Sequence, residues 1–195
     1  MAAEDSARPH ASFARKNEDL FRKHFPPGLD EQSAVLKAHL LIESMLRDFC
    51  MRSVDNPEYL QSARLTFNQI SLLGRSMFAL PVGSLDYAWT LVAKLNSLRN
   101  VMAHELEPDQ ARMDNLRESI IKMVNGNASD PKVSFDSLKD AVCYMCGLMD
   151  ALLSFSLAMK DPEFIALGEK DSASAAVAAA DETGGSQKPS REGGQ

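Results

Sequence analysis

The sequence predicts an all-α fold, an up-and-down helical bundle of four to five main helices with a peripheral N-terminal helix and a disordered C-terminal tail. Apolar residues recur at helical spacing in several long stretches, and no stretch alternates as a strand would. Turn-forming proline and glycine residues separate these stretches. We expect the 195 residues to form one domain with tails, with a disordered N-terminus over 1–11, a helical bundle domain over 12–165 and a disordered tail over 166–195.

Composition points to a cytoplasmic protein. Apolar residues make up 45% of the chain, which is enough for a sizeable core, and we expect no apolar run long enough to span a membrane. The first ten residues are polar and lack the apolar centre of a signal peptide. The three cysteines, an odd number, argue against a disulfide framework and fit a reducing compartment. We therefore expect no membrane partner.

Most of the negative charge lies near the C-terminus. The formal net charge is −6, and residues 161–195 hold seven acidic against three basic residues. The other 160 residues hold 20 acidic and 18 basic residues, so the folded part is nearly neutral. It lacks the strong basic excess that drives non-specific binding of nucleic acid. Any contact with RNA would therefore be local, weak or confined to a cleft.

The first two helices are bounded by clear signals. A peripheral helix is expected over 12–25, because Pro26-Pro27-Gly28 ends it. Asp30, with Ser33 as the alternative, is a good N-cap for a second helix that runs to about Val54. The second helix has a broad apolar face, typical of a buried bundle helix. The residues of that face are Val35, Leu36, His39, Leu40, Ile42, Leu46 and Phe49.

His39 and Glu43 stand four residues apart on this second helix and therefore share a face. The pair can be half of a metal site, or a second polar wall for a site formed elsewhere in the chain. It can equally be a buried histidine satisfied by the neighbouring carboxylate. The sequence offers no cluster of Cys, His or Asp that would complete a metal site, so we expect no metal and no cofactor.

The later helices follow from turn residues and from renewed apolar periodicity. We expect a third helix over 57–78 and a helix from Leu85, capped by Ser84. Next come a helix opening at Pro108 or Asp109, and a last helix that Ser134 or Asp136 caps and that ends near Lys160. The last helix contains Cys143 and Cys146. Redox CxxC motifs open a helix after a strand and zinc sites need a second pair, so these thiols are interpreted as structural.

The stretch 91–107, LVAKLNSLRNVMAHELE, is the one that suggests chemistry. It begins as an amphipathic helix and then presents Arg99, Asn100 and His104 where the helix should end. Asn100 and His104 share a face at i, i+4, while Arg99 is displaced by one step but has a long side chain. Together they can form an anion-binding, proton-transferring site. The alternative is that Arg99 pairs with Glu43 or Glu105, and that His104 merely caps the helix.

The segment Arg99-Asn100-Val101-Met102-Ala103-His104 resembles the R-N-x-x-A-H form of the Rx4-6H motif of HEPN domains. The resemblance covers about 30–160. It implies a small helical bundle, usually a homodimer, that acts as a metal-independent ribonuclease in toxin–antitoxin, phage-defence or RNA-processing systems, with an antitoxin or regulatory protein as partner. A second, weaker resemblance is to mannitol-operon repressor-like proteins, which share a helical bundle and a similar segment, and which would be non-catalytic regulatory or partner-binding modules.

Residue chemistry supplies a mechanism for the first resemblance. RNA cleavage by attack of the 2′-OH needs a group that takes the hydroxyl proton, and His104 exchanges protons near neutral pH. Arg99 offers a fixed fork of donors to phosphate oxygens, and Asn100 can orient either group. His39 and Glu43 would be supporting polar residues. We therefore expect an RNA substrate and a 2′,3′-cyclic phosphate product.

Overall fold

The chain forms two compact units, Met1–Ala158 and Met159–Gln195, each of which is described by itself. The predicted disordered tail lies, from residue 167 onward, outside the residues described, and most of the predicted disordered N-terminus does so too. In the second unit, residues 162–166 are helical. The computed structural model describes residues 8–79, 85–104, 107, 109–128 and 132–166.

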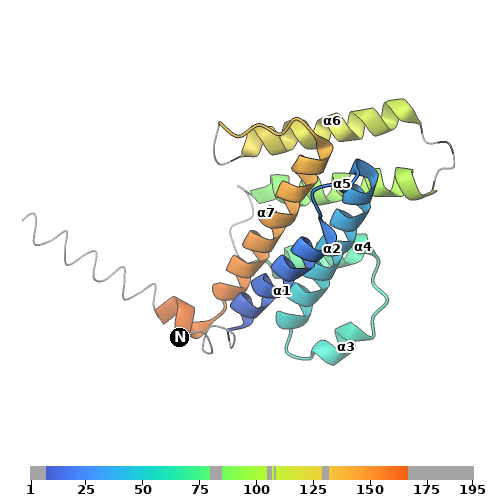
Figure 1. Ribbon diagram of the computed structural model, residues 1–195. Coiled ribbons are helices and arrows are strands. Elements are labelled where there is room, and N and C mark those ends of the chain that lie inside the picture. The colour runs from blue at the N-terminus through green and yellow to red at the C-terminus, as the bar shows by residue number, and fades with distance from the viewer. Residues whose placement is uncertain (1–7, 80–84, 105–106, 108, 129–131, 167–195) are drawn as a thin grey trace, which may run out of the picture. The chain divides into compact units, whose positions relative to one another are not determined.

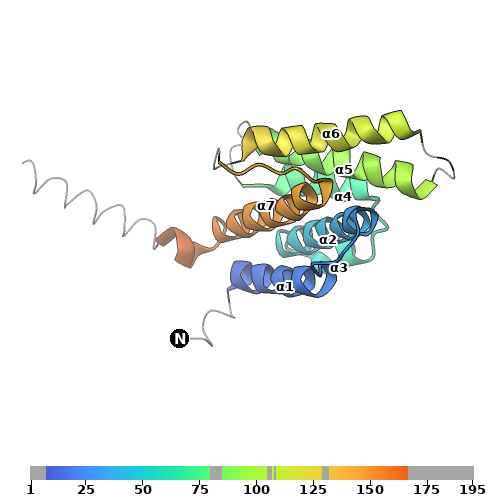
Figure 2. The ribbon, with the colours of Figure 1, turned by 45° about the horizontal axis from the view of Figure 1, so that its top comes forward.

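The fold is all-α, as predicted, and no described residue belongs to a strand. Helix α2 lies in the middle and packs against α1, α4, α5 and α7. Figures 1 and 2 show α5 and α6 side by side and running in opposite directions, with α7 passing beside both α2 and α1. The helices of the first unit are α1 (Pro9–His24), α2 (Glu31–Arg52), α3 (Pro57–Gln61), α4 (Phe67–Met77), α5 (Asp86–His104), α6 (Gln110–Asn127) and α7 (Leu138–Ala158).

Helix α2 begins and faces the core for local reasons that the sequence shows. The Asp30 side chain accepts a hydrogen bond from the Ser33 backbone N–H at 2.8 Å, which satisfies one of the free amides of the first turn. Leu40 departs from the prediction, because its side chain is 62% exposed. Helices on several sides of α2 bury the positions around Leu41, and they leave only the narrow sector that contains Leu40 open to solvent.

The predicted third helix is two helices. The short α3 ends at Gln61, and α4 begins after Thr66. Thr66 and Gln69 form a capping box, in which each side chain binds the backbone N–H of the other residue. Such a box satisfies two free donors and so stabilises a new helix start inside a stretch whose apolar spacing alone suggests continuity. Arg47 of α2 also donates to the Leu65 carbonyl at 2.6 Å, which ties the break to α2.

Other boundaries depend on single caps. Helix α1 begins at Pro9, three residues earlier than expected, because proline fits the first helical position. Asp109 caps α6 by accepting from the Arg112 backbone N–H, which is one of the two predicted starts. Ser137 caps α7, so the predicted caps Ser134 and Asp136 were wrong. The Ser137 hydroxyl accepts from the Asp140 N–H at 3.1 Å and donates to the Asp140 carboxylate. The predicted break at 81–83 and the Ser84 cap lie outside the described residues.

Helix α7 is apolar enough to have two interpretations. By length and composition alone, Leu138–Ala158 could cross a membrane, contrary to our expectation that no such run exists. The core helix of a soluble fold meets the same criteria. Helix α7 packs against α1, α2, α5 and α6, and half of its apolar stretch is buried inside the fold. Its hydropathy therefore matches its place among the other helices.

Gly74 allows α4 to approach α2 and α5 closely. A Cβ atom at this position would lie 3.1 Å from Leu46 Cδ2 and 3.7 Å from the Trp89 ring. Contacts at 3.1 Å require the neighbour to move. The absence of a side chain at Gly74 therefore sets the distance between these helices, and it offsets the propensity cost of glycine inside a helix.

Gly74→Leu is expected to lower the free energy of unfolding by about 1–3 kcal/mol through overpacking. Gly147→Leu is the matched control, because Gly147 lies in α7 with nothing within 4 Å of a built Cβ. The control should gain up to about 0.8 kcal/mol of helix propensity. Urea unfolding followed by circular dichroism measures both changes. Equal effects of the two substitutions would contradict the close approach at Gly74.

Candidate functional site

The last turns of α5 carry the residues of the predicted site. From Leu91 onward, one side of α5 faces the core and buries five residues, whereas Ala93, Ser97 and Asn100 lie exposed on the other side. Arg99 is half-buried between the two sides. The apolar side holds the helix in place and leaves the polar side available to a ligand. Its residues are Leu91, Val92, Leu95, Leu98 and Val101.

Arg99 and Asn100 are joined directly. The Arg99 guanidinium donates a hydrogen bond from Nη1 to Asn100 Oδ1 at 3.1 Å. Arg99 is offset from Asn100 by one residue around the helix, and its long side chain reaches across this offset. The bond presents a cation and an amide together on the exposed end of α5.

His104 is the last residue of α5. Its side chain and the whole of Glu105 lie outside the described residues. The backbone position keeps His104 four residues from Asn100 on the same helix, so the two residues share a face. The alternatives that involve the side chains of His104 and Glu105 stay predictions.

His39 is buried, with 4% of its surface exposed, and it connects α2 to α5. Its Nε2 lies 3.1 Å from Asn96 Oδ1, and its ring stacks on Phe67 with the centroids 4.1 Å apart. Because an amide oxygen only accepts, Nε2 carries the proton. The partner of His39 is thus the amide of Asn96 on α5, the helix that carries Arg99, Asn100 and His104, rather than the carboxylate of Glu43.

Electrostatics keep this histidine neutral. Burial lowers the pKa of His39 below its usual value, and the positive charge of Arg99 lowers it further, while the hydrogen bond that His39 donates to Asn96 and the charge of Glu43 act in the opposite direction. A neutral ring next to Arg99 leaves the guanidinium as the cation of this cluster.

Asn96 was not identified from the sequence as a member of the site. It stands three residues before Arg99 and four before Asn100, so it lies one turn away on the same helix. A polar amide inside the apolar stretch of α5 was the available signal. What the sequence could not show is its partner His39, which is 57 residues away.

Glu43 bonds within its own helix. Its carboxylate accepts from Arg47 Nη2 at 2.7 Å and from Arg47 Nε at 3.1 Å, while Arg47 also donates to the Leu65 carbonyl. Glu43 therefore orients the arginine that holds the break between α3 and α4. Glu43 affects the candidate site through its negative charge, which acts to raise the pKa of His39.

The cysteines are placed for packing. Cys146 is buried and Cys143 is half-buried in α7, and neither is in a disulfide. Burial raises the pKa of both thiols, so the reactive thiolate is disfavoured. Among the described residues, no group of three or more His, Cys, Asp or Glu side chains could hold a metal ion.

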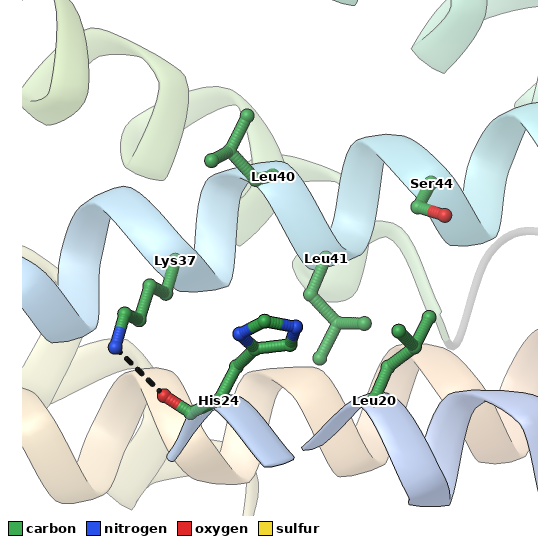
Figure 3. Close-up of a pocket in the computed structure, with 6 residues that line it drawn as sticks. All are labelled: Leu20, His24, Lys37, Leu40, Leu41 and Ser44. Carbon is green, nitrogen blue, oxygen red and sulfur yellow. Dashed lines mark hydrogen bonds between the residues drawn. The ribbon is translucent and has the colours of Figure 1, made fainter.

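A separate hollow lies between α1 and α2. It has a volume of about 200 Å³, and its floor is apolar (Figure 3). Lys37 closes one end by donating to the backbone carbonyl of His24 at 3.1 Å, and the exposed Leu40 stands at its rim. The hollow offers an apolar surface with basic neighbours. Its lining residues are Leu20, His24, Lys37, Leu40, Leu41 and Ser44.

Comparisons with known protein families, with curated proteins and with solved structures find no match for this chain.

The neutral state of His39 predicts a pH dependence of stability. Because the folded pKa is lowered, the unfolded chain binds the proton more readily, so this contribution is fully present above pH 6.5 and is lost as the pH falls through the folded pKa. His39→Gln keeps an amide donor for Asn96 but does not titrate. The stability advantage of wild type over His39→Gln should therefore shrink between pH 7.5 and pH 5.5, measured by urea unfolding. A constant difference would show that folding does not shift the pKa of His39, and a difference that grows toward pH 5.5 would show that folding raises it.

Proposed function

We propose that this protein is a metal-independent endoribonuclease that acts through Arg99, Asn100 and His104, in the manner of the HEPN domains that its motif resembles. The observation that carries the proposal is the hydrogen bond between the Arg99 guanidinium and the Asn100 amide on the exposed end of α5. A planar cation fixed next to an amide is suited to a phosphodiester, because both groups bind its oxygens. The buried His39 binds the half-buried Asn96 and so connects α5 to α2.

In the proposed reaction, His104 takes the proton of a ribose 2′-OH. The 2′-oxygen then forms a bond to phosphorus, and the bond from phosphorus to the 5′-oxygen of the next nucleotide breaks. Arg99 stabilises the negative charge that develops on the phosphorane, and Asn100 positions the phosphate or His104. The departing 5′-oxygen takes a proton from an acid, and the products are a 2′,3′-cyclic phosphate end and a 5′-hydroxyl end.

A homodimer is part of this proposal. One copy of α5 presents one histidine, whereas the reaction uses a base for the 2′-OH and an acid for the leaving oxygen. A second copy that brings its own motif to the same cleft would supply the second proton-transferring group. The exposed side of α5 carries the small residues Ala93 and Ser97, which allow a second helix or an RNA strand to approach closely.

Arg99→Ala and His104→Ala should each lower the rate of RNA cleavage by about a hundredfold or more, and Asn100→Ala should have a smaller effect. Arg64→Ala, at an exposed arginine in the break between α3 and α4, is the matched control and should retain full activity. The assay scores cyclic-phosphate ends on single-stranded and structured RNA in the presence of EDTA. A wild-type protein that stays inert, also after removal of any copurifying antitoxin, would refute the nuclease.

A second candidate function rests on the hollow between α1 and α2. The apolar hollow and the exposed Leu40 beside it offer a surface on which a partner can dock, and Lys37 places a positive charge at one end of it. Charge complementarity then favours one occupant, an amphipathic helix of a partner protein with leucines on one face and carboxylates beside them. The protein would in this case be a non-catalytic partner-binding module, as the mannitol-operon repressor-like resemblance implies.

A synthetic helix with a leucine face flanked by glutamates tests this second candidate. Leu40→Asp should weaken its binding by about tenfold to a hundredfold, because a buried leucine contributes roughly 1.5–3 kcal/mol. Leu72→Asp is the matched control, since Leu72 on α4 is similarly exposed, at 58%, and lies outside the hollow. Fluorescence anisotropy of the labelled peptide measures both. No binding by wild type, or equal losses in both variants, would rule out the docking surface.

A further inference from the structure

A groove runs between α5 and α6, and Lys94 and Ser97 line it on the α5 side. It has a volume of about 610 Å³ and is open to solvent. Its lining combines two cations with hydroxyl and amide groups, and it holds one carboxylate. The polar residues of the groove are Lys94, Ser97, Asp109, Arg112, Asn115 and Ser119.

The hydrogen bonds inside the groove determine what it offers to a ligand. Lys94 Nζ donates to Ser119 Oγ at 3.1 Å, which uses one of its three ammonium donors. The hydroxyl protons of Ser97 and Ser119 are donated to backbone carbonyls of their own helices. The Ser97 oxygen can therefore act as an acceptor, while Lys94 supplies charged donors. This set of donors and acceptors matches a chain that alternates phosphates with hydroxyl-bearing sugars.

The one carboxylate is already engaged. Asp109 Oδ1 accepts from the Arg112 backbone N–H as the cap of α6, so it is held by the helix terminus. The first amides of α6 also direct partial positive charge toward this end of the groove. The groove thus carries two cations and one carboxylate, on a folded unit that is nearly neutral as a whole.

The groove leads to the motif. Ser97 and Asn100 are three residues apart and both exposed on α5, so they are neighbours on one helix face. Lys94 and Asn100 are separated by about 9 Å along the helix axis, which is short enough for one extended strand to contact both.

We propose that the α5–α6 groove binds the ribose-phosphate backbone of single-stranded RNA and directs the strand to Asn100. This inference rests on the proposed function, and it names the part of the substrate that lies outside the reacting phosphate. Lys94 binds a phosphate, and the Ser97 oxygen accepts from a 2′-hydroxyl group. Affinity comes from this groove, whereas the motif performs the cleavage.

Binding is measured by fluorescence anisotropy with labelled single-stranded RNA, in the His104→Ala background so that the strand stays intact. Lys94→Glu should weaken binding by about tenfold or more, and Lys94→Met should lower the slope of log affinity against log salt by about 0.7, as expected for one lost phosphate contact. Lys122→Glu is the matched control, because Lys122 is exposed on α6 outside the groove; its affinity should match that of the parent. Thermal melts establish that all variants are folded.

Two further readouts distinguish the groove from a general charge effect. RNA should bind more tightly than DNA of the same sequence, and Ser97→Ala should reduce that preference. In the active protein, Lys94→Met should raise KM several-fold with kcat nearly unchanged. Equal losses in Lys94→Glu and Lys122→Glu, or tighter binding of a polyglutamate peptide than of RNA, would overturn the proposal.

The outcomes separate this inference from the nuclease on which it rests. If no cleavage is found but RNA binding depends on Lys94, the groove stands and the nuclease fails. If cleavage depends on Arg99 and His104 but the affinity for RNA does not depend on Lys94, the nuclease proposal stands and the groove proposal fails.

Discussion

Helix α2 is in contact with α1, α4, α5 and α7 at once, and His39 is the one polar side chain among the buried residues that the structure describes in this helix. Such a side chain needs partners inside the protein, because a buried polar group without one costs about 1–3 kcal/mol. His39 meets this demand at Nε2, which binds Asn96, while its ring stacks on Phe67 and its Nδ1 is buried without a hydrogen-bond partner among the described residues. The same contact acts with the buried apolar side of α5 to set the rotation of that helix. The placement of Arg99 and Asn100 at the surface follows from that rotation.

This dependence connects stability with the candidate chemistry. The neutral His39 lies close enough to Arg99 for the guanidinium to lower its pKa, so the two groups share one electrostatic environment. Charging His39 would place a second cation near Arg99 and would weaken the packing between α2 and α5. The motif end of α5 is therefore held most firmly under conditions in which a histidine can also act as a base.

Local signals in the sequence were enough to predict the all-α fold and several helix starts. Asp30 and Asp109 are short acceptors next to apolar periodicity, and each forms its cap without help from distant residues. The predictions were wrong where packing between distant segments decides the exposure of a side chain or the end of a helix. The exposure of Leu40 depends on which sector of α2 its neighbours leave open, and apolar spacing alone cannot rank it against Leu41. The break before Thr66 combines a local capping box with the Arg47 contact to Leu65, and the latter is long-range.

For the candidate site, the sequence could identify the residues but not their connections. Arg99, Asn100 and His104 stand out as polar groups at the end of an amphipathic helix, and the bond between Arg99 and Asn100 is a short-range feature. The pairing of His39 with Asn96 joins two helices that are far apart in the chain, and no periodic pattern encodes it. The groove between α5 and α6 likewise exists only once the two helices are side by side.

The close approach at Gly74 also has a consequence for the history of this sequence. Because a built Cβ at Gly74 meets Leu46 and the Trp89 ring, these three positions cannot vary independently. A larger residue at 74 becomes tolerable only after position 46 has become smaller, so the order in which substitutions occur matters. Related sequences should therefore show paired changes at 46 and 74, and chains that retain a leucine at 46 should retain the glycine.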